Sequence, residues 1–226
     1  DIFLRAPDGV LINEKDELHV PDKSVSIEQP LIVPLTMRVT DESWLQRDGI
    51  IELRFPNRVA RMPLTVVAFD SQLEVVREQT VIEDVELRTV RAGQYELSAS
   101  PDYCGNLVRY RHSTEGGMLY DTFPEVKPFI WWDSHYSGLT PVIAGYNVWD
   151  WESSIPKEAW SISDLAIGPW RGYELESVLQ HCPRMCGMTF RFRYLLLSGT
   201  ALVHIKVTAE NTSRITRQFV LGVRGA

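Results

Sequence analysis

The sequence has few cysteines, no long apolar run and no excess of basic residues, and each absence excludes a class of protein. Three cysteines in 226 residues are too few for the disulfide framework of a small secreted domain. No run of about 18 apolar residues is present, so we expect no membrane-spanning segment and no membrane partner. The net charge of −7, without a basic tail, argues against a nucleic-acid partner, because phosphate binding needs clustered cations.

Targeting signals and common catalytic motifs are missing as well. The chain begins at Asp1 without a methionine or a charged and then apolar leader, so we expect a mature form or a piece of a longer protein with neighbouring domains. The missing signal favours the cytoplasm. No nucleophile elbow, P-loop, dinucleotide-binding glycine pattern or H-E-x-x-H motif occurs. Carbohydrate chemistry is the enzyme class that keeps positive support.

Helix signals are nearly absent, because no segment of about a dozen residues combines apolar spacing of three and four with caps. Short β-rich runs recur instead at intervals of roughly ten residues, separated by Gly, Pro, Asp and Asn. They span residues 30–39, 49–55, 62–69, 73–80, 82–90, 93–99 and 106–111. This pattern predicts an all-β fold, an antiparallel β-sandwich.

The clearest alternation lies in residues 188–197, followed by turn residues at 198–200 and a second alternating run at 201–209. One face of the first run carries Met188, Phe190, Phe192 and Tyr194. If the two runs pair as a hairpin, the other face carries Arg191, Arg193, His204 and Lys206. That face is either a solvated exterior or a cationic patch facing an acidic sugar or a partner chain.

A change of character near residue 91 suggests two domains. Before it lie short strands with a single tryptophan, Trp44, whereas after it come longer loops and aromatic clusters. We therefore expect an N-terminal β segment over residues 1–91 and a β-sandwich domain over residues 92–226.

The most informative stretch is the aromatic segment, residues 131–151. Six of the seven tryptophans fall between Trp131 and Trp170, together with five carboxylates and one lysine. Rings beside carboxylates are typical of a surface that binds sugars, because a pyranose stacks on a ring while its hydroxyls bond to Asp or Glu. The alternative is a loop whose rings close the end of the sandwich.

Two further features have both a functional and a structural interpretation. Asp133 and His135 lie two apart and share a side of an extended segment, as an acid–base pair would, although a histidine among tryptophans is more often a packed residue. His181, Cys182 and Cys186 offer three soft ligands, but a lone C-x3-C is a weak zinc signal, and free thiols or a local disulfide are the plainer interpretation. We expect no cofactor.

Several stretches after residue 93 resemble galactose mutarotase-like supersandwich domains in strand order and in a few Gly, Trp and Asn positions. They are 95–108, 116–120, 123–125, 131–141, 170–176 and 187–212. The resemblance implies a two-sheet sandwich whose concave face binds carbohydrate, in a superfamily where some members are catalytic and others only bind. A full supersandwich needs more chain than these 134 positions, so either the first 90 residues contribute strands or the chain is a partial supersandwich.

The sequence thus predicts a carbohydrate-binding or carbohydrate-processing β-sandwich. Its candidate binding residues are Trp131, Trp132, Tyr136, Trp149, Trp151 and Glu174, and its candidate catalytic residues are Asp133 and His135. We expect no catalysis from this chain alone; mutarotase-like or glycosidase-like chemistry would need His135 or two carboxylates converging in one groove. The alternative is a non-catalytic structural or protein-interaction module of a larger protein.

Overall fold

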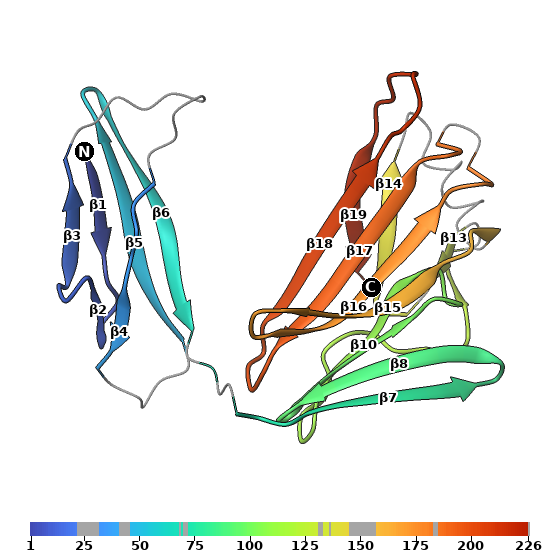
Figure 1. Cartoon of the computed structure of the whole chain (residues 1–226). Helices are drawn as coiled ribbons and strands as arrows, with labels where there is room; N and C mark the ends of the chain where they lie inside the picture. The colour runs from blue at the N-terminus through green and yellow to red at the C-terminus, as the bar shows by residue number, and fades with distance from the viewer. Residues whose placement is uncertain are drawn as a thin grey trace. The chain divides into compact units, whose positions relative to one another are not determined.

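The computed structural model describes residues 1–21, 32–40, 46–67, 69, 72–130, 133–135, 137–144, 157–182 and 185–225. The chain forms two compact units, Asp1–Phe69 and Asp70–Ala226. Every described pairing between strands is antiparallel, as predicted for an all-β sandwich (Figure 1). No helix of the described residues is long and apolar enough to cross a membrane.

The first unit contains a four-stranded sheet and a separate strand pair. Its strands are β1 (Ile2–Arg5), β2 (Val10–Ile12), β3 (Glu17–Val20), β4 (Met37–Val39), β5 (Gln46–Phe55) and β6 (Arg58–Val67). The sheet has the order β3-β1-β5-β6, and β2 pairs with β4. Its small core centres on Leu4, Ile12 and Val20, with Ile51 and Leu64 packed against them.

The second unit begins with a large sheet in the order β19-β14-β10-β9-β8-β7, which we call the first sheet; β11 pairs with β10. Its strands are β7 (Val75–Ile82), β8 (Val85–Ala92), β9 (Tyr95–Ser100), β10 (Asn106–His112), β11 (Gly116–Gly117), β14 (Leu139–Ala144) and β19 (Val220–Gly225). The chain's last strand pairs with β14 along six residues, Leu139 to Ala144.

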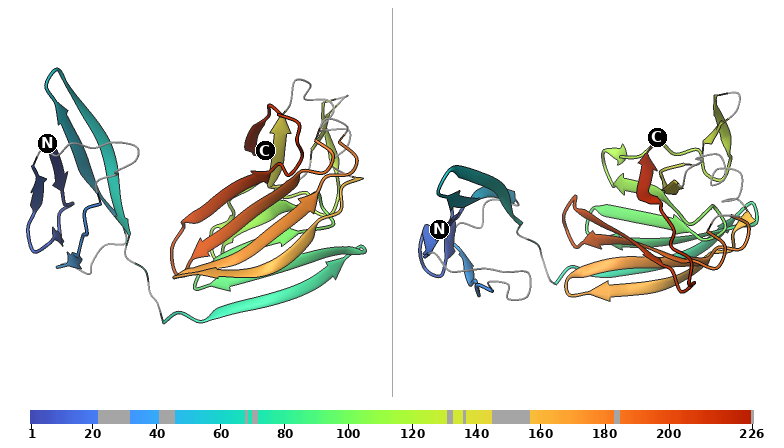
Figure 2. Two further views of the ribbon diagram at one scale, coloured as in Figure 1. Left: turned by 45° about the horizontal axis from the view of Figure 1, so that its top comes forward. Right: turned by 90° about the horizontal axis from the view of Figure 1, so that it is seen from above.

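A four-stranded second sheet, in the order β15-β16-β17-β18, packs face to face on the first (Figure 2). Its strands are β15 (Ser161–Ile167), β16 (Trp170–Val178), β17 (Thr189–Leu197) and β18 (Val203–Glu210). A small hairpin of β12 (Lys127–Ile130) and β13 (Asp133–His135) completes the described strands.

The main core lies between these two sheets, and the alternation in residues 188–197 predicted its centre correctly. Phe190, Phe192 and Tyr194 of β17 are fully buried against Val90, Leu97 and Leu107 of the first sheet. Each such side chain contributes about 1.5–3 kcal/mol by its burial. The predicted hairpin also forms, with Arg193 of β17 opposite Lys206 of β18.

The expected boundary at residue 91 is wrong in position. Arg91 lies near the end of β8, which pairs with β9 through the turn at Gly93, so the strands on both sides of the boundary belong to one hairpin. The units divide between Phe69 and Asp70 instead. The change in aromatic content after residue 91 marks only a difference between strands of the same sandwich.

Candidate functional site

About half of the aromatic segment lies outside the described residues, including the predicted binding residues Trp131, Trp132, Tyr136, Trp149 and Trp151. Asp133 and His135 lie two residues apart in β13, which pairs with β12. Their positions are therefore on the same side of one short strand. Their side chains also lie outside the described part. The roles of these residues in binding or catalysis remain predictions.

The other two tryptophans after residue 131 have structural surroundings. Trp160 is buried in the main core, where its ring meets Phe192 edge-on at 5.6 Å between centroids. Gly105 lies directly under the Trp160 ring, so close that a side chain there would clash with it. Trp170 of β16 lies 5.6 Å from the ring of His204. Part of the tryptophan cluster therefore serves packing.

Glu174, a predicted binding residue, lies on β16 in the second sheet and pairs with Arg193 of β17. The neighbouring Arg191 bonds to both Glu176 and Glu210, and these carboxylates raise the pKa of its guanidinium. The arginines of this face are therefore neutralised by cross-strand carboxylates. The face corresponds to a charge-balanced exterior rather than to the cationic patch considered from the sequence.

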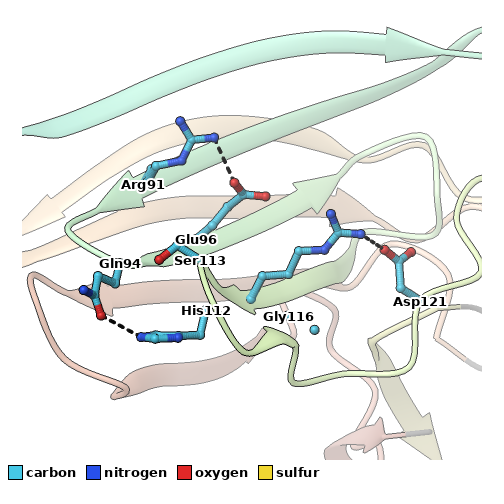
Figure 3. A pocket seen from close by; sticks show the side chains of 9 residues that line it. Arg91, Gln94, Glu96, His112, Ser113, Gly116 and Asp121 are labelled. Carbon is cyan, nitrogen blue, oxygen red and sulfur yellow. Dashed lines mark hydrogen bonds and ion pairs between the residues drawn. The ribbon is translucent and has the colours of Figure 1, made fainter.

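A polar pocket of about 520 Å³ lies in the first sheet instead (Figure 3). It is lined by Arg91, Gln94, Glu96, Arg111, His112, Ser113, Gly116, Gly117 and Asp121. Arg91, Glu96 and Arg111 come from β8, β9 and β10, on the side opposite the buried Val90, Leu97 and Tyr110. The pocket is thus on the outer face of the sandwich.

The side chains of the polar pocket are held in pairs. Arg91 Nη2 donates to Glu96 Oε2 at 2.9 Å, and this bond raises the pKa of Arg91. Arg111 Nη2 donates to Asp121, and His112 Nε2 lies 2.8 Å from Gln94 Oε1 (Figure 3). Ion pairs of this kind contribute little to folding but fix the direction of the groups.

Two glycines keep the pocket open. Gly117 of β11 lies opposite Arg111, the position from which a side chain would project beside the guanidinium. Gly116 adopts a φ of 85°, which an L side chain rarely takes, and a Cβ there would meet no atom within 4 Å. The backbone of β11 is therefore accessible from the pocket.

Asp121 links the pocket to the start of the aromatic segment. It accepts hydrogen bonds from Arg109 Nε at 2.6 Å and from the N–H of Phe123 at 3.1 Å. The buried Ser137 accepts N–H bonds from Thr122 and Phe123. Ser137 lies just before β14, so these bonds tie the start of that strand to the turn that holds Asp121.

This arrangement suits hydrogen bonding to a polar ligand. A guanidinium has five N–H donors and a carboxylate about four acceptor positions, so Arg91, Arg111 and Glu96 retain capacity for a ligand. Asp121 already accepts hydrogen bonds from Arg109, Arg111, Phe123 and Ser137. Among the described residues no group of His, Cys, Asp and Glu could hold a metal ion, and Cys182 and Cys186 are free thiols.

Sequence reasoning missed every residue of the polar pocket. Arg91, Glu96 and Arg111 are ordinary outward residues of their strands, and only the strand register places them together. The Gly116-Gly117 pair after a polar turn was the one signal that could have pointed to them.

Comparisons with known proteins give no relative. No protein-family model matches the chain, and neither a curated protein nor a solved structure has significant similarity to it.

Proposed function

We propose that the second unit is a non-catalytic carbohydrate-binding β-sandwich domain, in agreement with the resemblance to galactose mutarotase-like domains. The observation that carries the proposal is the polar pocket, where fixed arginine–carboxylate pairs surround an open strand of two glycines. Sugar hydroxyls both donate and accept hydrogen bonds, so they can accept from Arg91 or Arg111 and donate to Glu96. The rings of the aromatic segment would supply stacking surface.

The hydrogen bonds made by the two carboxylates of the pocket favour binding over catalysis. Glu96 and Asp121 each accept a hydrogen bond from an arginine. A carboxylate held in this way accepts a hydroxyl donor well, whereas a general acid must carry a proton and release it during the reaction.

The test is a titration of the protein with a panel of neutral oligosaccharides, followed by tryptophan fluorescence and calorimetry. Arg111→Gln removes a charged donor worth about 1.5–3 kcal/mol, so binding should weaken roughly 10- to 100-fold. Arg193→Gln is the matched control, because Arg193 also forms an ion pair with a carboxylate, Glu174, but on the second sheet. Trp132→Ala tests the aromatic segment in the same assay.

Two results would contradict the proposal. One is the absence of any response to the whole panel. The other is equal binding by the Arg111→Gln and Arg193→Gln variants, which would place the ligand elsewhere on the protein.

A second candidate function is that of a protein-interaction module, and the first unit favours it. Four large apolar side chains of its β5–β6 hairpin are exposed: Phe55 by 45% and Met62 by 45% on one face, and Ile50 by 41% and Val59 by 54% on the other. Such surfaces are often covered by a partner. Co-purification of the full-length protein with a partner, and its loss on Val59→Asp, would support this function for the first unit.

A further inference from the structure

We infer that the polar pocket selects neutral glycans and rejects anionic ones such as uronates. This inference rests on the proposed function and adds the class of ligand. Its basis is the charge balance of the lining: the positive charges of Arg91 and Arg111 are matched by the negative charges of Glu96 and Asp121. No other Lys, Arg, Asp or Glu lines the described pocket.

Each arginine already has more than one charged neighbour. Arg91 lies 2.9 Å from Glu96 and also 3.5 Å from Oε1 of Glu78 on the adjacent strand. Arg111 shares Asp121 with Arg109, whose Nε is 2.6 Å from that carboxylate. Glu78 and Arg109, just outside the lining, add one negative charge beside Arg91 and one positive charge beside Asp121, so the total charge of the group stays at zero.

His112 is held through both nitrogens of its ring. Its Nδ1 accepts the backbone N–H of Glu115 at 3.3 Å and lies 3.1 Å from Thr114 Oγ1. Its Nε2 lies 2.8 Å from Gln94 Oε1, so the ring is fixed at the edge of the pocket.

An anionic ligand group would have to compete with these fixed carboxylates. The remaining N–H groups of Arg91 and Arg111 lie beside Glu96 and Asp121, so an anion bound to them would stay close to a fixed negative charge. A hydroxyl group has no such conflict. It can accept from a guanidinium N–H and donate to a carboxylate oxygen while both pairs stay in place.

The experiment uses matched ligands on the whole chain. Neutral gluco-, manno- and galacto-oligosaccharides are compared with the same compounds oxidised at C6 to uronates. For those that bind, we expect oxidation to weaken binding roughly tenfold or more, which is about 1.4 kcal/mol. Equal or tighter binding of the uronates would overturn the inference and leave the proposed function intact. No binding of either form would overturn both.

A variant tests the charge balance directly. Glu96→Gln leaves the lining with one uncompensated positive charge, so the preference for neutral ligands should shrink severalfold. In about 1 M salt, where the screening length is about 3 Å, this effect of the substitution should be smaller. Glu86→Gln is the matched control: Glu86 pairs with Arg88 at 2.6 Å on the same strand as Arg91 but does not line the pocket. The same preference in both variants would refute the role of the charge balance.

Discussion

Replacing Tyr110 by phenylalanine should stabilise the protein, which is unusual for a core substitution. Tyr110 of β10 belongs to the main core, and its hydroxyl is buried with no hydrogen-bond partner among the described residues. A buried polar group without a partner costs about 1–3 kcal/mol. Tyr110→Phe removes that group and keeps the ring, so the free energy of unfolding at pH 7 should rise by about 1 kcal/mol.

The same substitution should also change the response to alkali. Burial, with a smaller contribution from the nearby Tyr95, raises the pKa of Tyr110 to about 12, against about 10 in an unfolded chain. Below pH 10 the hydroxyl is protonated in both states. Above it the unfolded state loses the proton first, so stability falls between about pH 10 and 12. Two pH units correspond to about 3 kcal/mol, which the Tyr110→Phe variant would not lose.

Urea unfolding measured by tryptophan fluorescence suits this test, because six of the seven tryptophans belong to the second unit. Curves are recorded at pH 7 and at steps up to about pH 11, within the range in which the effect develops. Tyr120→Phe is the control, since it removes the same hydroxyl from a side chain that is 53% exposed. A Tyr110→Phe protein that is less stable at pH 7, or that loses stability with pH as steeply as the wild type, would refute the reasoning.

Two further substitutions test the packing of the second unit. The buried Glu158 accepts backbone N–H bonds from Gln180, His181 and Cys182 at 2.7–2.9 Å. Glu158→Gln should therefore lower the free energy of unfolding in urea by about 2–4 kcal/mol and speed the labelling of the buried Cys182 thiol. An unchanged unfolding midpoint would contradict this. A Cβ at Gly172 would lie 2.0 Å from a backbone oxygen of β17, so Gly172→Ala should lower the free energy of unfolding by about 1–3 kcal/mol. A Gly172→Ala protein as stable as the wild type would show that the strands can separate freely there.

The parts of the fold that follow from local alternation could be predicted from the sequence. Each strand of a sandwich has one buried side, so Phe190, Phe192 and Tyr194 indicate the core face without any knowledge of the partner sheet. The same holds for the turn at residues 198–200, which joins β17 to β18. These features depend on neighbours within about ten residues.

The features that depend on distant pairing could not be predicted. β14 pairs with β19 across more than 70 residues, and nothing local to Leu139 or Val220 indicates the other. In the first unit, strands of three or four residues such as β2 and β3 are too short for alternation to be recognised. The boundary at residue 91 failed for the same reason, because aromatic content does not report which strands pair.

The polar pocket shows how register creates a site from ordinary residues. Both sheets carry opposite charges at paired positions of their outer faces: Arg111 with Glu96 in the first sheet and Arg193 with Glu174 in the second. The difference lies in the next strand. Arg193 faces the side chain of Lys206, whereas Arg111 faces Gly117, which has none. The hollow of the first sheet therefore lies beside its ladder of charges, and a glycine pair opposite an outward arginine is the sequence feature that marks it.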